Sequence, residues 1–129
     1  LGVSMCGRMN QKMDLSQVVD FFAVTSGRER LEMLPLRYNT APTQDVICVR
    51  MSHEREFFPA RWGLIPAWAN DEKIGASCIN ARSETVDTKP AFRTALRCRR
   101  CIVIASGFYE WRKGDKRAPI STLVNSSES

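Results

Sequence analysis

The chain has 129 residues, of which 43% are hydrophobic and 26% charged, and it carries a formal net charge of +5 with a pI near 9.2. This length suits one domain and this composition is that of a folded protein, so two full cores and intrinsic disorder are both excluded. Charged residues interrupt every apolar run before the roughly 18 residues that a membrane helix needs, and the basic charge permits an anionic partner without requiring one.

The first distinctive stretch is Met5-Cys6-Gly7-Arg8, which places a thiol two residues from a fixed positive charge. If Met5 is the initiator and is removed, Cys6 carries an α-amine beside its thiol. These two groups titrate near ~7.7–8.0 and ~8.5, and a nearby Arg8 favours the thiolate. Such an aminothiol captures an aldehyde, first as an imine and then as a five-membered thiazolidine. The alternative is that Cys6 is a small, half-buried apolar residue near the chain end.

The clearest element is a helix over residues 14–25, which we expect Asp14 to cap and Ser26-Gly27 to end. Its apolar residues recur at i, i+3, i+4 and i+7, the spacing of one buried helical face: Leu15, Val18, Val19 and Phe22. Residues 28–34 form a short second helix or a loop. Residues 37–42 are irregular, because the residue before Pro42 is pushed out of the helical region.

Strands are predicted over residues 46–51 and 57–62, and the polar segment 52–55 between them indicates a hairpin. Residues 63–79 are predicted to be a long loop, which in a small domain is typically functional. Residues 90–97 can form one or two helical turns with Pro90 near the start. A strand of buried type follows over residues 101–105. Further strands are expected over 108–112 and 120–124, with a turn at 113–116 and a polar tail at 125–129.

These elements predict an α+β domain built mostly on antiparallel sheet with a few short helices. The last strand has only begun where the chain stops, so we expect a sheet that is incomplete at the C-terminus. Residues 1–5 are interpreted as an extension or propeptide, residues 6–124 as the domain, and residues 125–129 as the tail.

Five cysteines, an odd number without framework spacing, indicate reduced thiols and an intracellular protein. Cys98 and Cys101 form a CxxC pair, which alone lacks two further zinc ligands. The candidates for those ligands are Cys48, His53 and Cys78, which stand at no familiar spacing. We therefore expect no metal and no cofactor. The arginines over residues 93–100 either contact phosphates or form a solvated face.

Five segments follow one another in order along residues 5–111. They are Met5-Cys6-Gly7-Arg8, Arg37-Tyr38-Asn39-Thr40-Ala41-Pro42, Arg61-Trp62-Gly63-Leu64-Ile65-Pro66 with Trp68, Ile79-Asn80-Ala81-Arg82-Ser83-Glu84-Thr85 and Gly107-Phe108-Tyr109-Glu110-Trp111. Together they resemble the SOS-response-associated peptidase (SRAP) family, and they cover a little over half of a typical family domain.

The resemblance implies a SRAP-like fold with a barrel-like core, of which this chain supplies the N-terminal part. It implies a sensor in the DNA damage response that cross-links covalently to abasic sites in single-stranded DNA through an N-terminal cysteine. The expected partner is therefore single-stranded DNA containing abasic sites, with no membrane. We expect a monomer in the cytoplasm, associated with the nucleoid.

The resemblance also implies roles for individual residues. Cys6, Asn80 and Glu110 match the family's catalytic positions: an amide can hold the sugar or the amine, and a carboxylate can move protons. Five more match DNA-binding positions, through phosphate contacts or a flat apolar surface for unstacked bases: Arg8, Asn39, Pro42, Trp68 and Arg82. From the residues alone, Glu110 reads as an exposed strand residue, Arg8 and Arg82 as surface charges, and Trp62 and Trp111 as core.

Two departures from the family pattern matter. Residues 1–5 precede Cys6, so the thiazolidine requires their removal. No histidine follows Trp111, where the family has a further catalytic one, so ring opening or reversal of the cross-link is expected to be less efficient. Two alternative functions stay open: an N-terminal-nucleophile peptidase in which Cys6 cuts an amide, and a non-catalytic binder of single-stranded nucleic acid.

Overall fold

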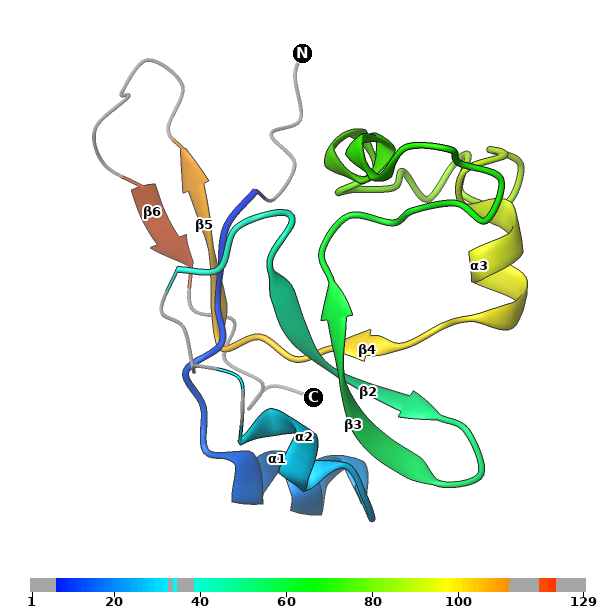
Figure 1. Cartoon of the computed structure of the whole chain (residues 1–129). Helices are drawn as coiled ribbons and strands as arrows, with labels where there is room; N and C mark the ends of the chain where they lie inside the picture. The colour runs from blue at the N-terminus through cyan, green and yellow to red at the C-terminus, as the bar shows by residue number, and fades with distance from the viewer. Residues whose placement is uncertain (1–6, 33, 35–38, 112–118, 123–129) are drawn as a thin grey trace.

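The computed structural model describes residues 7–32, 34, 39–111 and 119–122 (Figure 1). All of its strands and helices are short. In chain order they are β1 (Met9–Asn10), α1 (Leu15–Phe22), α2 (Arg28–Leu31), β2 (Asp45–Met51), β3 (Arg55–Arg61), a 3₁₀ helix (Glu72–Ser77), α3 (Arg93–Cys98), β4 (Ile102–Val103), β5 (Gly107–Trp111) and β6 (Pro119–Thr122).

The strands form two antiparallel three-stranded sheets, ordered β1-β5-β6 and β3-β2-β4. The chain passes from the second sheet to the first between β4 and β5, while α1 and α2 lie together at one end of the molecule (Figure 1). The predicted α+β class with mostly antiparallel sheet is confirmed. The barrel-like core is not: over the residues that the structure describes, neither sheet closes on itself.

Helix α1 begins as predicted and ends early. The Asp14 side chain accepts a hydrogen bond from the Ser16 amide at 2.8 Å, which caps the first turn. Ala23 adopts a left-handed conformation with φ of 50°, so the helix ends before residue 25. The predicted apolar face packs against the larger core cluster, whose buried members are Val24, Leu31, Ile47, Val49, Phe57 and Ile104.

The predicted hairpin is confirmed, with β2 and β3 paired along their whole length from Asp45 opposite Arg61 to Met51 opposite Arg55. Phe57 is fully buried at the centre of the core. Gly27 lies against it with φ of +85°, and a Cβ there would stand 2.2 Å from the Phe57 carbonyl oxygen. Only glycine fits this position, which fixes the approach of α2 to β3.

Two other predictions need correction. The long loop over residues 63–79 contains the 3₁₀ helix. The strand expected over 101–105 is reduced to β4 and is half exposed rather than buried, because β2 pairs with one side of it and no described strand with the other. The strand expected over 120–124 is present as β6, in which Ser121 and Thr122 lie opposite Tyr109 and Phe108. The turn at 113–116 and the tail at 125–129 lie outside the described residues.

One buried side chain joins the two sheets. Gln11 follows β1, and its carboxamide accepts a hydrogen bond from the Ile47 amide at 3.1 Å while donating to the carbonyls of Ile47 and Ile104. The amide of Ile104 donates to the Ile47 carbonyl at 3.1 Å. The Gln11 side chain therefore takes the place of a ladder hydrogen bond where the chain leaves the β3-β2-β4 sheet.

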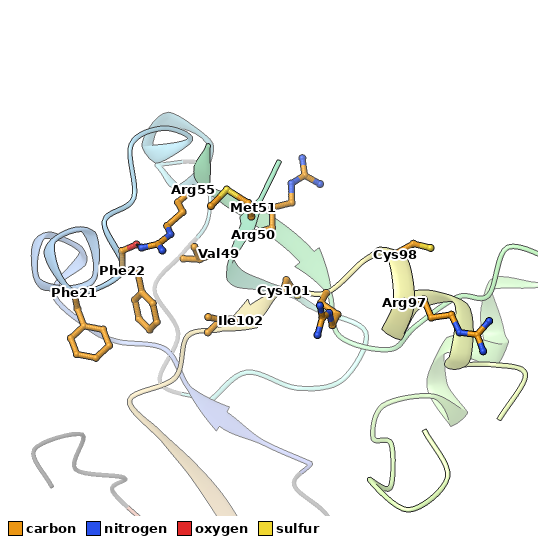
Figure 2. Close-up of a pocket in the computed structure, with 11 residues that line it drawn as sticks. Phe21, Phe22, Val49, Arg50, Met51, Arg55, Arg97, Cys98, Cys101 and Ile102 are labelled. Carbon is orange, nitrogen blue, oxygen red and sulfur yellow. The ribbon is translucent and has the colours of Figure 1, made fainter. Parts of the chain in front are cut away.

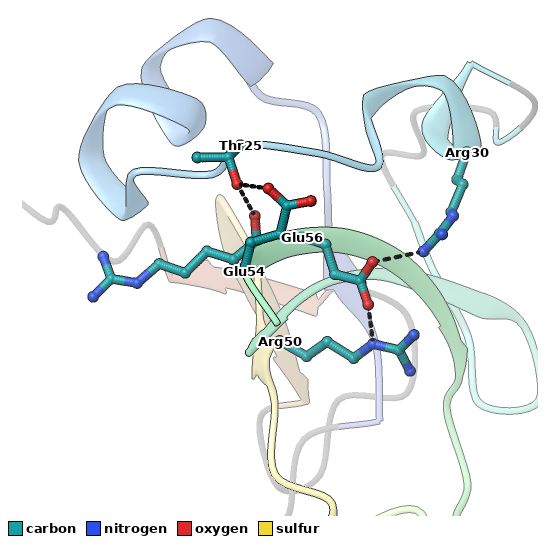
Figure 3. Close-up of polar contacts among 6 residues, drawn as sticks. Thr25, Arg30, Arg50, Glu54 and Glu56 are labelled. Carbon is teal, nitrogen blue, oxygen red and sulfur yellow. Dashed lines mark hydrogen bonds and ion pairs between the residues drawn. The ribbon is translucent and has the colours of Figure 1, made fainter. Parts of the chain in front are cut away.

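A second polar cluster lies at the turn end of the hairpin (Figure 3). Glu56 is buried and accepts hydrogen bonds from Arg50 at 2.7 Å and Arg30 at 3.0 Å. The hydrogen bond from Arg50 is the largest cause that holds the pKa of Glu56 below its ordinary value of 4.5, against the opposing effect of burial. The charged form of Glu56 is therefore favoured in the folded chain.

This cluster predicts an acid-sensitive part of the stability. Because the pKa of Glu56 is lower in the folded chain, its contribution is fully present above the unfolded value and is lost as the pH falls through the folded value. We expect Glu56→Gln to flatten the fall in the free energy of unfolding below pH 4.5. Urea titrations across the acid range measure this, and Arg50→Met is expected to flatten the same region. An unchanged acid limb in both variants contradicts the assignment.

Candidate functional site

Two of the predicted DNA-binding residues meet at the start of β1. The guanidinium of Arg8 donates a hydrogen bond to the Asn39 side-chain oxygen at 3.4 Å, and both side chains are exposed. Their backbones are held by the adjacent pair, because Met9 and Thr40 exchange two amide–carbonyl hydrogen bonds of 3.1 and 2.7 Å. Residues 31 positions apart are thereby joined into one polar surface.

Strand β5 lies on the other side of β1. Met9 is opposite Phe108, and the Tyr109 amide donates to the Arg8 carbonyl at 3.0 Å. Glu110 is the next residue along β5 and pairs through its backbone with Ile120 of β6. The backbone segment that carries Arg8 therefore runs beside the strand that carries Glu110. The Glu110 and Trp111 side chains, and the whole of Cys6, lie outside the described parts of the chain.

Asn80 is anchored to the same region through Trp62. The indole of Trp62 donates to the Ile79 carbonyl at 2.8 Å, and the Leu64 amide donates to the Cys78 carbonyl at 3.1 Å. Trp62 is buried with Val46 and Cys48, as its core interpretation predicts, and both Met9 and Ile79 pack against this cluster. Arg8 and half-buried Asn80 are thus each adjacent in sequence to a residue packed on one small core.

Pro42 occupies a tight turn joined to Trp62. The Gln44 amide donates to the Ala41 carbonyl at 3.2 Å, and the Gln44 side chain accepts from the Ala41 amide at 3.0 Å. Thr43 has φ of 73°, so residues 41–44 form a type II turn with proline at its second position. The Thr43 amide and the Gln44 carbonyl both pair with the backbone of Trp62, which fixes the turn beside the site.

Thr43 is strained in this turn, because β-branched residues rarely adopt a positive φ. Glycine removes the strain but loses more conformational entropy on folding. We expect the first effect to be the larger, so that Thr43→Gly raises the free energy of unfolding by about 1 kcal/mol. Chemical denaturation measures the difference. Thr43→Ala serves as the control, since alanine keeps a Cβ at the same φ and is expected to gain less. A destabilised glycine variant contradicts the turn geometry.

A residue that the sequence did not single out is Thr40. It is fully buried, and its hydroxyl oxygen has no hydrogen-bond partner. A buried hydroxyl without a partner costs free energy that an apolar group of the same shape avoids. We expect Thr40→Val to raise the free energy of unfolding by about 1 kcal/mol. Thr94→Val, at an exposed position on α3, is the matched control for the change of side chain, and a destabilised Thr40→Val variant would count against this reading.

The remaining predicted residues lie on exposed loops. Trp68 is exposed near the turn in which the Ala69 amide donates to the Pro66 carbonyl at 3.0 Å. Arg82 is exposed two residues after Asn80 and begins a turn closed by the Thr85 amide. The structure brings Arg8 and Asn39 into contact, holds the segments that carry Pro42 and Asn80 against Trp62, and leaves Trp68 and Arg82 on two exposed loop segments.

The cysteines form a separate feature. Cys98 and Cys101 are exposed, whereas burial raises the pKa of the Cys48 thiol far above its ordinary value, with Cys101 as a further cause. A thiol held in its neutral form is a poor nucleophile and a poor metal ligand. In the part of the chain that the structure describes, no three His, Cys, Asp or Glu side chains are grouped to hold a metal ion. That part also contains no helix with the length and apolar character to cross a membrane.

The fold and the site together define a class of protein. It is an α+β domain in which the N-terminal strand β1 lies between residues 39–40 and β5. A family model for the SOS response associated peptidase (SRAP) matches residues 5–128, and the chain belongs to this family. It is 39% identical to the abasic site processing protein YoaM of Bacillus subtilis (strain 168) over 126 residues, which are 97% of this chain and 55% of YoaM. It is 42% identical over 66 residues to the abasic site processing protein HMCES of Rattus norvegicus, or 48% of this chain and 19% of that protein.

Solved structures agree with the family assignment. A protein from Bacteroides thetaiotaomicron superposes with a TM-score of 0.71 at 25% identity, over 90% of this chain and 52% of that one. A protein from Bordetella bronchiseptica gives a TM-score of 0.63 at 28% identity, over 81% of this chain and 50% of that one. The chain spans about half the length of the bacterial relatives and solved structures that it matches.

Proposed function

We propose that this chain senses abasic sites in single-stranded DNA and bonds covalently to them through Cys6. Membership of the SRAP family supports this proposal, as does the likeness to relatives named abasic site processing proteins. The observation that carries it is the placement of Arg8. Its backbone runs beside β5, which carries Glu110, while its side chain contacts Asn39.

The reaction needs Cys6 as the first residue. Its α-amine adds to the aldehyde carbon of the ring-opened abasic sugar, and loss of one water gives an imine. The Cys6 sulfur then adds to the same carbon as its proton passes to nitrogen, which closes a thiazolidine. Every atom is accounted for by the protein, the sugar and one released water, so no oxidant or cofactor is required.

The neighbouring residues have distinct proposed roles. Asn80 holds the sugar or the amine through a neutral donor and acceptor, and Glu110 accepts the amine proton and returns it to the sugar oxygen. Arg8 and Arg82 bind the phosphates beside the lesion, and the contact with Asn39 orients the Arg8 guanidinium. Pro42 and Trp68 offer apolar surface to the bases on either side of the gap, at about 1–3 kcal/mol per stacked base.

The proposal is tested by comparing two forms of the protein, one that begins at Cys6 and one that keeps residues 1–5. Each is incubated with a single-stranded oligonucleotide that contains one abasic site and run on a denaturing gel. We expect a shifted band with the form that begins at Cys6, and with the longer form only where residues 1–5 have been released. Neither form is expected to shift an intact oligonucleotide. Folded Cys6-first protein that gives no shifted band overturns the proposal.

The same experiment separates the two alternatives. Salt-dependent binding of both oligonucleotides without a covalent band indicates a non-catalytic binder of single-stranded nucleic acid. Release of residues 1–5 by the purified protein, blocked by Glu110→Gln, indicates a peptidase activity of Cys6. That cleavage is compatible with the main proposal, because it would expose the α-amine that the cross-link requires.

A further inference from the structure

A groove lies between α1 and β4, on the α1 side of the β3-β2-β4 sheet. One hollow of about 700 Å³ is bordered by apolar side chains, among them Phe21, Met51 and Ile102, and by four arginines: Arg50, Arg55, Arg97 and Arg100. Another of about 490 Å³ is bordered by Val18, Phe21, Phe22 and Val103. Both hollows share Phe21 and Phe22, and together they follow the chain over residues 101–106. Figure 2 shows Phe21 and Phe22 on one side of Ile102, and Arg97 and Cys98 of α3 on the other. We call the two hollows the α1–β4 groove.

The groove gathers most of the exposed apolar surface. Five large apolar side chains are exposed among the described residues, and all but Trp68 border it: Phe21 (76%), Met51 (64%), Ile102 (50%) and Val103 (45%). Exposed apolar side chains that gather along one groove mark an interaction site, and another polypeptide segment is one kind of partner for such a site. Phe21 stands edge-on to Phe22 at 4.9 Å between ring centroids, so the α1 wall of the groove is a firm aromatic surface.

The groove also runs along an edge of β4 with which no described strand pairs. The Ile104 amide donates to Ile47, toward β2, so the Val103 amide, one residue earlier in the strand, points away from β2. The opposite edge of the same sheet is protected. Thr25 and Ser26 pair with the outer edge of β3, and Pro59 there has no amide hydrogen to donate. Among the described strands of this sheet, β4 alone presents an open, apolar edge.

We propose that the α1–β4 groove binds an extended, apolar polypeptide strand from the part of the SRAP domain that this chain does not match, and that the strand pairs with β4. The relatives supply the argument for this occupant. YoaM matches over 55% of its length and the Bacteroides structure over 52%, so each contains nearly as much polypeptide again, with apolar surface of its own to bury. Strand addition satisfies the Val103 amide while the side chains of the added strand fill the two hollows.

This inference rests on family membership and not on the abasic-site chemistry, so failure of the cross-link leaves it standing. The test uses the whole chain, labelled with ¹⁵N, and overlapping short peptides that tile the YoaM sequence. Peptides from the unmatched part of YoaM are expected to shift the Val103 and Phe21 amide signals and to slow exchange of the Val103 amide at least about tenfold. Peptides from the matched part are expected to do neither.

Variants locate the interaction. Val103→Pro removes the outward amide, and Phe21→Asp places a charge in the groove, so both are expected to abolish the shifts. Trp68→Ser changes an exposed aromatic outside the groove and is expected to keep them. The signal of buried Phe57 reports that each variant is folded. If Val103→Pro unfolds, the proposal is tested by Phe21→Asp and by the exchange rate of the Val103 amide in the parent chain.

Three results would overturn the inference. The first is that no peptide perturbs Val103 at about 1 mM, a concentration that detects even weak strand addition. The second is that peptides bind Phe21→Asp as well as the parent chain. The third is that the groove binds another occupant. A second copy of this chain would be detected as self-association that is lost in Val103→Pro, and single-stranded DNA as binding that is lost in Arg97→Ala.

Discussion

Replacing Cys6 with serine, in the form that begins at this residue, is expected to abolish the covalent adduct with abasic DNA. Serine keeps the α-amine and therefore the imine step, but a hydroxyl is far less nucleophilic than a thiolate at neutral pH and does not close a stable ring. The residual imine is reversible and is lost under denaturing conditions. Quantifying the shifted band on a denaturing gel measures the effect, which we expect to exceed about 100-fold.

The control is reduction with borohydride before the gel. Borohydride traps an imine, so the serine variant is expected to regain a band when it is added, while the parent protein is already fully cross-linked without it. Cys98→Ser, which changes an exposed thiol on α3, is the matched cysteine control and is expected to react like the parent. Equal adduct formation by Cys6→Ser without borohydride would show that the sulfur takes no part.

Changing Gln11 to glutamate is expected to lower the free energy of unfolding by about 3 kcal/mol near neutral pH. The carboxylate can still accept from the Ile47 amide, but it cannot donate to the carbonyls of Ile47 and Ile104, which then face a buried negative charge. The loss is expected to lessen in acid, where a protonated carboxyl donates again. Urea denaturation at two pH values measures both effects.

Gln17→Glu is the matched control, because Gln17 lies on the exposed face of α1 and is expected to tolerate the change. Loss of the Gln11 hydrogen bonds is also expected to disturb the candidate site. Asn10 and Gln11 follow Met9 directly, and the Ser106 hydroxyl and amide donate to Asn10 just before β5. A Gln11→Glu variant as stable as the control would show that the two sheets are held together by other contacts.

The elements that could be predicted are those whose signal is local. Helix α1 follows from the apolar spacing of its buried face and from Asp14, and the hairpin from two β-rich runs with a polar turn between them. Gln11 carries no such signal, since its partners lie 36 and 93 residues away and its flanking residues, Asn10 and Lys12, are polar. The burial of Thr40 has no local signal either, because it depends on the pairing with Met9, which is distant in the sequence.

The predicted burial of β4 was wrong for a related reason. An apolar run such as Ile102-Val103-Ile104 reads as a buried strand, because sequence spacing cannot say whether a second strand is available to cover its other edge. The candidate site, too, could be predicted only in part. Its residues come from the family resemblance, whereas the pairing of β1 with residue 40 and β5, which brings Arg8 to Asn39, emerges only from the fold.

The central claim is that a thiol and an amine on one terminal residue trap the abasic aldehyde. Intact mass spectrometry of the complex between the Cys6-first protein and an abasic oligonucleotide tests it most directly. The account predicts one adduct whose mass is the sum of the two components less one water, stable to denaturation without a reducing agent, with Cys6 as the modified residue. An adduct on a lysine, or two unmodified masses after incubation of the folded protein, would contradict it.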